Sequence, residues 1–172
     1  MTEPFNGSWR INLEKSRVWD TDNQKWVSPD PIGREDLTFF ITDEIYDQTI
    51  AVGINPVFHM GYTARWDGDW VPYMCRRVEI PDAVAPTGHP RMELGPQTPM
   101  VPNQPTAYIK MIKISNVFHY RISRNVDWTN PGYVMSRSMN ADEMSFQSTV
   151  LSPGGEAVIV RVFERADDES TA

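Results

Sequence analysis

The last third of the chain most constrains the fold, because it holds five short strand-like segments in succession. Each has seven or eight residues and is rich in β-branched and aromatic types. They are Ala107–Ile114, Val117–Arg124, Tyr133–Met139, Met144–Leu151 and Ala157–Glu164. Turn-forming residues such as Ser115-Asn116 separate them. Short strands at regular spacing, with turn residues between them, predict an antiparallel sandwich or barrel.

The first half of the chain contributes further predicted strands. They are Trp9–Leu13, Leu37–Ile41, Ile45–Gly53, Val57–Trp66 and Asp69–Arg76. Asp67-Gly68 is a typical hairpin turn, and Pro72 predicts an edge strand or a bulge because proline lacks an amide donor. The polar segment after the first strand looks irregular, and its start, Leu13–Asp20, is compatible with one or two helical turns. We therefore expect one all-β domain over residues 1–172, an antiparallel barrel of about eight to ten strands.

A long segment, Glu79–Thr106, interrupts this pattern. It holds seven of the 14 prolines in the chain and has no hydrophobic period. A loop of this length inside a domain is usually functional or disordered. Three interpretations stay open: a lid over the mouth of the barrel, a contact with a second subunit in a homodimer, or a plain surface loop.

Composition limits the partners of the chain. Its formal net charge of -7 argues against nucleic acid and against an anionic membrane surface, because both bind through Lys and Arg. Cys75 is the only cysteine, so neither an intramolecular disulfide nor a thiolate metal cluster is expected. No apolar stretch approaches the roughly 20 residues of a membrane helix, and no signal sequence is recognised. We expect a cytoplasmic protein with no membrane partner.

Three stretches match features of a known family. Phe5–Ser16 (FNGSWRINLEKS) contains a Gly-x-Trp strand that leads into an Asn-Leu-x-Lys-Ser turn. Tyr62–Tyr73 (YTARWDGDWVPY) contains an Asp-Gly hairpin with a proline in its return arm, and Ser136–Arg165 reads as the closing hairpins. Together they resemble bacterial lipocalin-like proteins of the calycin type.

The resemblance implies a lipocalin-like barrel with an interior pocket open at one end. In such proteins a tryptophan of the first strand is packed by an arginine near the last strand. Trp9 matches the first position, and either Arg161 or Arg165 matches the second. The proline-rich segment is an insertion relative to the family pattern.

Two strand histidines are candidates for proton transfer, because the unperturbed pKa of histidine, about 6.5, suits this role near neutral pH. Alternation places His59 on a face with Arg65, and His119 on a face with Arg121, opposite the aromatic residues. An apolar interior would point both histidines outward, whereas a polar interior would point both inward. The sequence leaves this choice open, because a one-residue slip exchanges the two faces. A hydrogen-bonded structural histidine is the alternative at each position.

The candidate catalytic residues are His59, His119 and Tyr120. The candidate substrate-binding residues are aromatic, thioether and arginine side chains of the predicted strands and their ends: Tyr62, Arg65, Trp66, Met111, Phe118, Arg121, Tyr133, Met135, Arg137 and Phe146. No metal-binding or nucleotide-binding motif is present in the sequence, so neither a metal nor another cofactor is expected.

These observations lead to one expected function and two alternatives. The polar strand residues favour an acid/base enzyme without a cofactor, of the lyase, isomerase or hydratase type, acting on a small hydrophobic or aromatic molecule inside the barrel. The absence of a sharp catalytic motif favours the first alternative, a non-catalytic protein that binds or carries a small hydrophobic ligand. The second alternative is an oligomeric structural protein whose barrel is filled by aromatic side chains.

Overall fold

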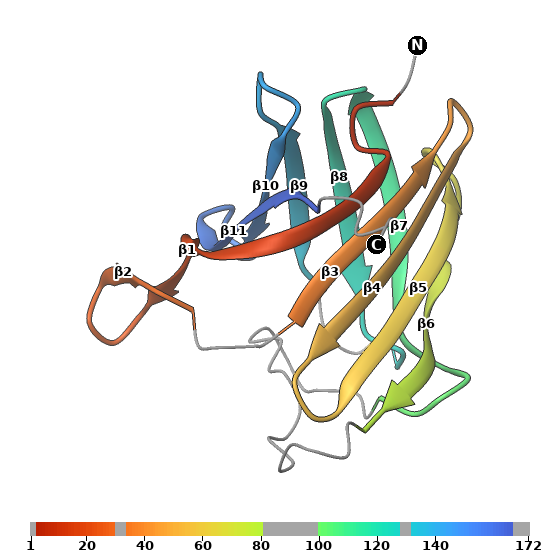
Figure 1. Ribbon diagram of the computed structural model, residues 1–172, viewed down its shortest axis with the longest axis horizontal. Coiled ribbons are helices and arrows are strands. Elements are labelled where there is room, and N and C mark those ends of the chain that lie inside the picture. Colours follow the sequence, from red (N-terminus) through yellow and green to blue (C-terminus); the bar gives the residue numbers. More distant parts are fainter. Residues whose placement is uncertain (1–2, 30–33, 81–99, 128–131, 167–172) are drawn as a thin grey trace, which may run out of the picture.

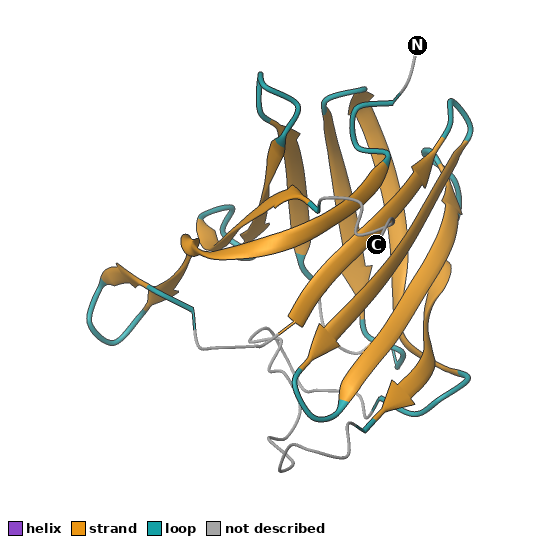
Figure 2. Ribbon diagram, in the orientation of Figure 1, coloured by secondary structure: helices purple, strands orange, loops and turns teal. Residues whose placement is uncertain are grey.

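The computed structural model describes residues 3–29, 34–80, 100–127 and 132–166, and these residues form strands and turns without a helix (Figures 1 and 2). The strands are β1 (Gly7–Asp20), β2 (Lys25–Val27), β3 (Arg34–Ile41), β4 (Ile45–Gly53), β5 (Val57–Arg65), β6 (Val71–Glu79), β7 (Gln104–Ser115), β8 (Phe118–Arg124), β9 (Val134–Met139), β10 (Ser145–Leu151) and β11 (Ala157–Arg165). In this described part of the chain no helix is long and apolar enough to cross a membrane.

The strands close into an antiparallel barrel. From β3 to β11 each strand pairs with the next one along the chain, β3 also pairs with β1, and β11 returns to β1. The β1–β11 ladder includes Trp9 opposite Arg165 and Ile11 opposite Phe163. The predicted all-β antiparallel barrel is therefore confirmed, with ten strands in the barrel and β2 as an addition to β1.

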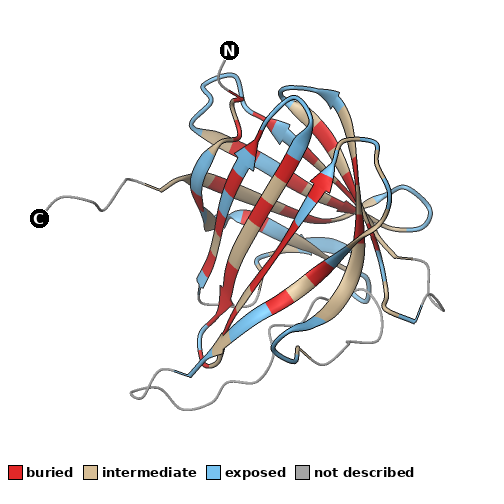
Figure 3. Cartoon of the chain, turned by 90° about the vertical axis from the view of Figure 1, so that its right-hand side faces the viewer, coloured by how far each residue is buried: buried red, intermediate tan, exposed pale blue. Residues whose placement is uncertain are grey.

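Buried and exposed positions alternate along the strands, as Figure 3 shows. On β5 the buried positions that face the interior include Phe58 and Met60, so the apolar face points inward and His59 points outward. On β8 the buried positions are His119, Arg121 and Ser123, so the polar face points inward. The expectation that both histidines point the same way is wrong, because His59 points outward and His119 points inward.

The predicted helical turn after the first strand is also wrong, because β1 continues to Asp20. The strand is interrupted by a bulge between Asn12 and Arg17 in its pairing with β11. Asn12 stabilises the bulge, since its side chain accepts from the Lys15 amide at 3.0 Å and its carbonyl accepts from the Ser16 hydroxyl at 2.7 Å. The side chains of Asn12 and Ser16 thus satisfy the irregular backbone of a bulge.

β6 lies between β5 and β7 and is not an edge strand. Pro72 itself is opposite Tyr108 of β7, and the bulge that was predicted at Pro72 lies just after it, between Tyr73 and Met74. The β5–β6 ladder ends at the pair Gly61 and Met74, so Pro72 has no partner on β5 in that ladder.

The end of the proline-rich segment is more regular than expected, because β7 begins at Gln104 and includes Pro105. Residues 81–99 of that segment lie outside the described residues. The interpretations of the segment as a lid or as a subunit contact concern these residues and therefore stay predictions.

One end of the barrel is filled with aromatic side chains, and we call it the aromatic end. Its members are Phe5, Trp9, Phe39, Tyr46, Trp66, His119 and Phe146. They lie at or beside neighbouring strand ends and contact one another edge to face. For example, the ring centroids of Phe5 and His119 are 4.7 Å apart, and those of Trp9 and Phe146 are 5.0 Å apart.

Arg165 closes this end over Trp9. Its guanidinium carbon lies 4.3 Å from the centroid of the Trp9 ring, and its nitrogens donate to the backbone carbonyls of Pro4, Asn6 and Glu143. Gly7 has φ of +111°, and a Cβ there would lie 3.1 Å from an Arg165 nitrogen. Of the two arginines that the resemblance implied for packing on Trp9, the structure thus selects Arg165.

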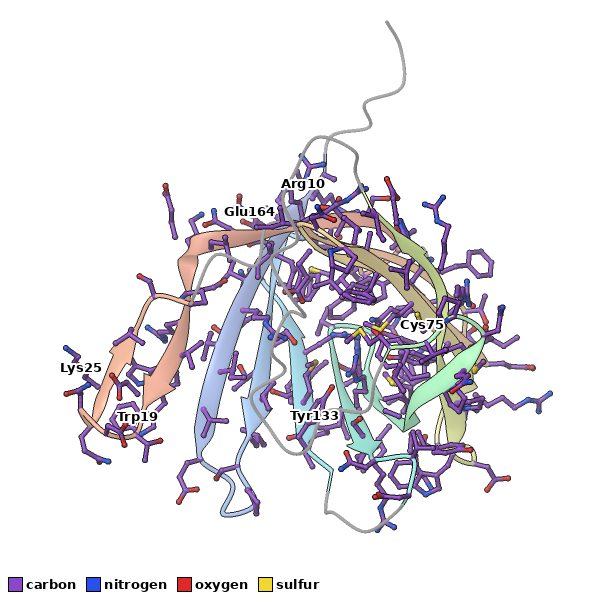
Figure 4. All side chains as sticks on the ribbon, turned by 90° about the horizontal axis from the view of Figure 1, so that it is seen from below. Arg10, Trp19, Lys25, Cys75, Tyr133 and Glu164 are labelled. Atoms are coloured by element: carbon purple, nitrogen blue, oxygen red, sulfur yellow. The ribbon has the colours of Figure 1, made fainter. Side chains whose placement is uncertain are left out.

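The far half of β1 and the short β2 form an arm that projects from the barrel (Figures 1 and 4). Trp19 of β1 packs on Trp26 of β2, with ring centroids 5.5 Å apart. Figure 4 labels Trp19 and Lys25 on this arm, well away from the barrel interior. The arm therefore lies apart from the cavity that follows.

Candidate ligand site

Beyond the aromatic end, the barrel interior contains a cavity. Its volume is about 50 Å³, within a space of about 600 Å³ between the lining atoms that includes the part open to solvent. Apolar and polar residues from most of the barrel strands line it: Glu35, Leu37, Gln48, Ile50, Val52, Met60, Tyr73, Met100, Arg121, Met135, Arg137, Ser148, Arg161 and Phe163. The mixture is typical of a small-molecule pocket with a few orienting polar groups.

Arg137 of β9 is one of two arginines buried in this cavity, and its residue is only 2% exposed. Its guanidinium donates to the Tyr46 hydroxyl and, at 2.8 Å, to the side-chain carbonyl of Gln48. The guanidinium carbon also lies 5.1 Å from the centroid of the Phe39 ring. All of these partners are neutral groups, and they fix the side chain against the wall formed by β3 and β4.

Arg121 of β8 is the second buried arginine, with 3% exposure. It donates to the hydroxyl of Tyr133, which lies just before β9 and is labelled in Figure 4. Its guanidinium carbon lies 5.3 Å from the centroid of the Tyr73 ring and 5.9 Å from that of Tyr62. Cation–π contacts of this kind favour the charged arginine without neutralising it.

Arginine side chains are always protonated in folded proteins, so both guanidinium groups carry a positive charge. Burial opposes the charge of Arg121, but the surrounding tyrosines, Tyr133 first among them, leave its pKa raised. Burial raises the pKa of Tyr46 and of Tyr73 above the usual range, against the opposing effect of the arginines, so these two hydroxyl groups stay neutral. No described carboxylate forms an ion pair with either arginine. The cavity therefore holds two guanidinium charges whose described partners are neutral.

Several buried donors of the cavity have no hydrogen-bond acceptor among the described residues. They are Nε of Arg121, Nε of Arg137 and Nε2 of Gln48. Buried polar groups are nearly always hydrogen-bonded, and buried charges are nearly always paired. An anionic group placed between these donors would satisfy both requirements at once.

A separate ion pair lies on another part of the cavity wall. Glu35 of β3 is 5% exposed, and its Oε2 lies 3.7 Å from Nε of Arg161 of β11. Arg161 is separated from Arg137 by one strand, because Ser148 of β10 is opposite Arg137 of β9 on one side and opposite Arg161 of β11 on the other. The Glu35–Arg161 pair is close to neutral, so it leaves the positive charge of Arg121 and Arg137 uncompensated.

His119 points into the barrel but not into the cavity. Its ring packs against Phe5, Tyr46 and Trp66 in the aromatic end. Burial, and then the positive charges of Arg137 and Lys113, hold the pKa of His119 well below its usual value. The imidazole is therefore neutral at neutral pH, and its Nε2 has no hydrogen-bond partner among the described residues.

The structure brings only part of the predicted site together. Arg121, Met135 and Arg137 line the cavity, and Tyr133 contacts Arg121. A second group faces the interior or its aromatic end without lining the cavity: Tyr62, Trp66, Met111, His119 and Phe146. A third group has side chains on the outer face of the barrel: His59, Arg65, Phe118 and Tyr120.

His59 is engaged on the outside by polar neighbours. Its Nε2 lies 2.8 Å from a carboxylate oxygen of Glu79 and 2.9 Å from a guanidinium nitrogen of Arg77. The predicted catalytic residues His59, His119 and Tyr120 are therefore in three different environments: an outer polar cluster, the aromatic end and the outer face of β8. The structure does not assemble them into one site.

Four polar residues of the cavity were not predicted from the sequence, namely Glu35, Gln48, Tyr73 and Ser148, and Arg161 was expected only to pack. The alternation of inward and outward positions along β3 and β4 could have identified two of them. Glu35 is in phase with the inward-facing Leu37, and Gln48 with the inward-facing Ile50. A charged or amide side chain in phase with buried apolar positions indicates a polar group inside the barrel.

The described residues contain no group of three or more His, Cys, Asp or Glu side chains placed to hold a metal ion. Cys75 is buried, and burial raises the pKa of its thiol. The polar groups that line the described cavity are arginine, tyrosine, serine and amide side chains and the carboxylate of Glu35.

Comparisons with known proteins show the class of fold. No family model and no curated protein matches the chain. One similar solved structure is a Schistosoma mansoni fatty acid binding protein in complex with arachidonic acid: it is 10% identical, with a TM-score of 0.57, and the match covers 95% of this chain and 97% of that one. Another is a fatty acid transporter, REP1-NXSQ, 11% identical, with a TM-score of 0.53 and coverage of 98% and 100%.

At these identities the similarity shows the fold alone. The chain is a calycin-type β-barrel, of the architecture found in fatty-acid-binding proteins. The narrower expectation from sequence, a bacterial lipocalin-like protein, stays a prediction.

Proposed function

We propose that this protein binds a small, narrow hydrophobic molecule with an anionic head group, and that Arg121 and Arg137 hold that head group. The observation that carries the proposal is the pair of buried guanidinium groups with neutral described partners and unsatisfied Nε atoms. A carboxylate is the best match, because arginine donors suit its two oxygens. The two similar structures, a fatty acid binding protein and a fatty acid transporter, support the same class of ligand.

Apolar residues next to the arginines provide a surface for the rest of the ligand. Met135, Val150 and Ile159 form a second apolar cluster on β9, β10 and β11, separate from the main core. Met135 belongs both to this cluster and to the cavity wall, and it is opposite Arg121 in the β8–β9 ladder. A head group at the arginines would therefore place an apolar tail beside this cluster.

The geometry favours binding over the acid/base reaction expected from the sequence. The two strand histidines do not share a site, and the described cavity wall contains neither of them. The cavity groups that are present can orient and neutralise an anion, and this is the chemistry of a binding protein.

The test compares decanoate with decanol, which has the same chain length and no charge, by isothermal titration calorimetry. We expect decanoate to bind at least about tenfold more tightly, since hydrogen bonds to charged groups contribute roughly 1.5–3 kcal/mol. Arg121→Met and Arg137→Met should each remove most of this preference, whereas Arg76→Met, at an exposed position on β6, should leave it unchanged. Equal binding of acid and alcohol by the wild type, or an undiminished preference in both cavity variants, would contradict the proposal.

A further inference from the structure

The cavity presents two kinds of unsatisfied polar atom, and they lie on different strands. The donors without acceptors belong to Arg121, Arg137 and Gln48, whereas one acceptor without a donor belongs to Glu35. Arg121 and Arg137 lie on the neighbouring strands β8 and β9, while Glu35 lies on β3. A ligand that satisfies the whole cavity therefore needs more than one polar group.

Glu35 is oriented into the cavity by the register of β3. It alternates in phase with Leu37 and Phe39, which are also buried, and it is opposite Val52 on β4. Its residue is 5% exposed. Its sequence neighbour Asp36 points to the other side, where it pairs with Arg10 and Arg34. Two adjacent carboxylates thus have different surroundings, and only Glu35 faces the interior.

The ion pair with Arg161 does not satisfy Glu35. The distance from Arg161 Nε to Glu35 Oε2 is 3.7 Å, which suits charge pairing but is too long for a hydrogen bond. No other described residue donates to Oε2. A buried carboxylate oxygen without a donor is costly, so the site favours any ligand that brings one.

The charge of the pair indicates the kind of donor. Because Arg161 already balances the charge of Glu35, a second cation is not required there, and a neutral donor is sufficient. A hydroxyl group meets this need, since it donates one hydrogen bond without adding charge. The carboxylate of a ligand would be repelled from Glu35 and attracted to Arg121 and Arg137, so the two ends of the ligand are distinguished.

Resting on the proposed function, we propose that the preferred ligand is a hydroxylated carboxylic acid. Its carboxylate lies at Arg121 and Arg137, and a hydroxyl group elsewhere on its chain donates to Glu35. The inward acceptor on β3 thereby selects hydroxylated acids over the corresponding plain acids.

The experiment measures calorimetric affinities for pairs of acids that differ by one hydroxyl. Hexanoate, octanoate, decanoate and dodecanoate are each compared with their ω-hydroxy counterparts, so that the series scans the separation between the two polar groups. At one or more lengths the hydroxyl should raise the affinity of the wild type by about tenfold or more. In Glu35→Met this gain should disappear or reverse, because the hydroxyl is then buried without an acceptor.

Two further variants keep the result interpretable. Asp36→Asn changes the adjacent carboxylate on the opposite face of β3 and should retain the hydroxyl gain. The double variant Glu35→Met/Arg161→Met removes both charges of the pair, so it provides the same test if the single variant does not fold.

The outcomes separate this inference from the proposed function. If plain acids bind and no hydroxy acid of any length binds more tightly, the selective role of Glu35 is wrong and the proposed function stands. If the hydroxyl gain persists without Glu35, another group makes the contact and the inference is equally wrong. If no acid binds, the proposed function fails and this inference fails with it.

Discussion

The aromatic end and the cavity are both built from inward-facing residues of the same barrel, yet their chemistry is opposite. At the aromatic end, rings from β1, β3, β4 and β10 contact one another, and Arg165 is satisfied by three backbone carbonyls. In the cavity, Arg121 and Arg137 are more deeply buried than Arg165, but their described partners are neutral and donors remain unsatisfied.

This difference separates what stabilises the barrel from what it does. Burying rings is favourable by itself, whereas burying a charge is unfavourable until a counter-charge arrives. The aromatic end should therefore contribute stability in the absence of any ligand. The cavity arginines should lower the stability of the ligand-free protein, and binding of an anion should restore it.

Replacing Trp9 with alanine should have the largest effect on stability. Trp9 is fully buried, its indole nitrogen donates to the Phe5 carbonyl at 2.7 Å, and Arg165 packs on its ring. We expect the free energy of unfolding to fall by about 3–5 kcal/mol, as for large-to-small changes in packed cores. Urea denaturation followed by circular dichroism measures it. A loss below about 1 kcal/mol would show that the aromatic end does not carry the fold.

Replacing Arg121 with methionine should have the opposite sign. The change removes a buried charge and leaves only the partly exposed Tyr133 hydroxyl without its donor. We expect the ligand-free variant to be more stable than the wild type by about 1–4 kcal/mol, while its affinity for decanoate falls. Arg76→Met on the outer surface should change stability by less than about 0.5 kcal/mol. Destabilisation by Arg121→Met would mean that this arginine is part of the structural core.

The same contrast explains how much the sequence predicts. Strand positions and the barrel followed from alternation and turn residues, because the last five segments match β7 to β11 closely. The inward face could not be assigned in the same way. Apolar Phe58 faces inward on β5, whereas aromatic Phe118 and Tyr120 face outward on β8 and pack on each other with centroids 5.1 Å apart. Only the pairing of distant strands decides between these choices.

Only part of the site was predicted, because the sequence does not show which residues face the interior. Arg121 and Arg137 were chosen as polar residues in strands, and both line the cavity. Glu35 was missed because the predicted strand began at Leu37, two residues after the true inward carboxylate. Closure of the barrel places residues of β3, β8 and β11 around one cavity. The periodicity of a single segment does not show which distant strands meet.

Acid should weaken the aromatic end through His119. Burial, with Arg137 and Lys113, keeps the pKa of His119 in the folded protein well below 6.5. Below pH 6.5 the unfolded chain therefore binds a proton that the folded protein does not, and stability falls as the pH falls. Relative to a His119→Phe variant, we expect the wild type to lose about 1.4 kcal/mol per pH unit below pH 6.5, until the folded protein itself titrates.

Urea titrations of both proteins at pH 7.5, 6.5, 5.5 and 5.0 measure this difference. The two curves should diverge only on the acidic side, because the imidazole is neutral in both states at higher pH. Parallel curves throughout would show that His119 has an ordinary affinity for protons, and that the aromatic end is open to solvent.

The smallest effect should come from the arm. Trp26 of β2 is 38% exposed, and β2 pairs only with β1 in the described sheet. The arm can therefore open locally without disturbing either the aromatic end or the cavity. We expect Trp26→Ala to change the global free energy of unfolding by less than about 0.5 kcal/mol and to leave decanoate affinity unchanged, while amide hydrogen exchange in β2 becomes faster. A larger loss of unfolding free energy would mean that the Trp19–Trp26 contact is coupled to the barrel. The stability of the protein would then depend on the arm as well as on the aromatic end.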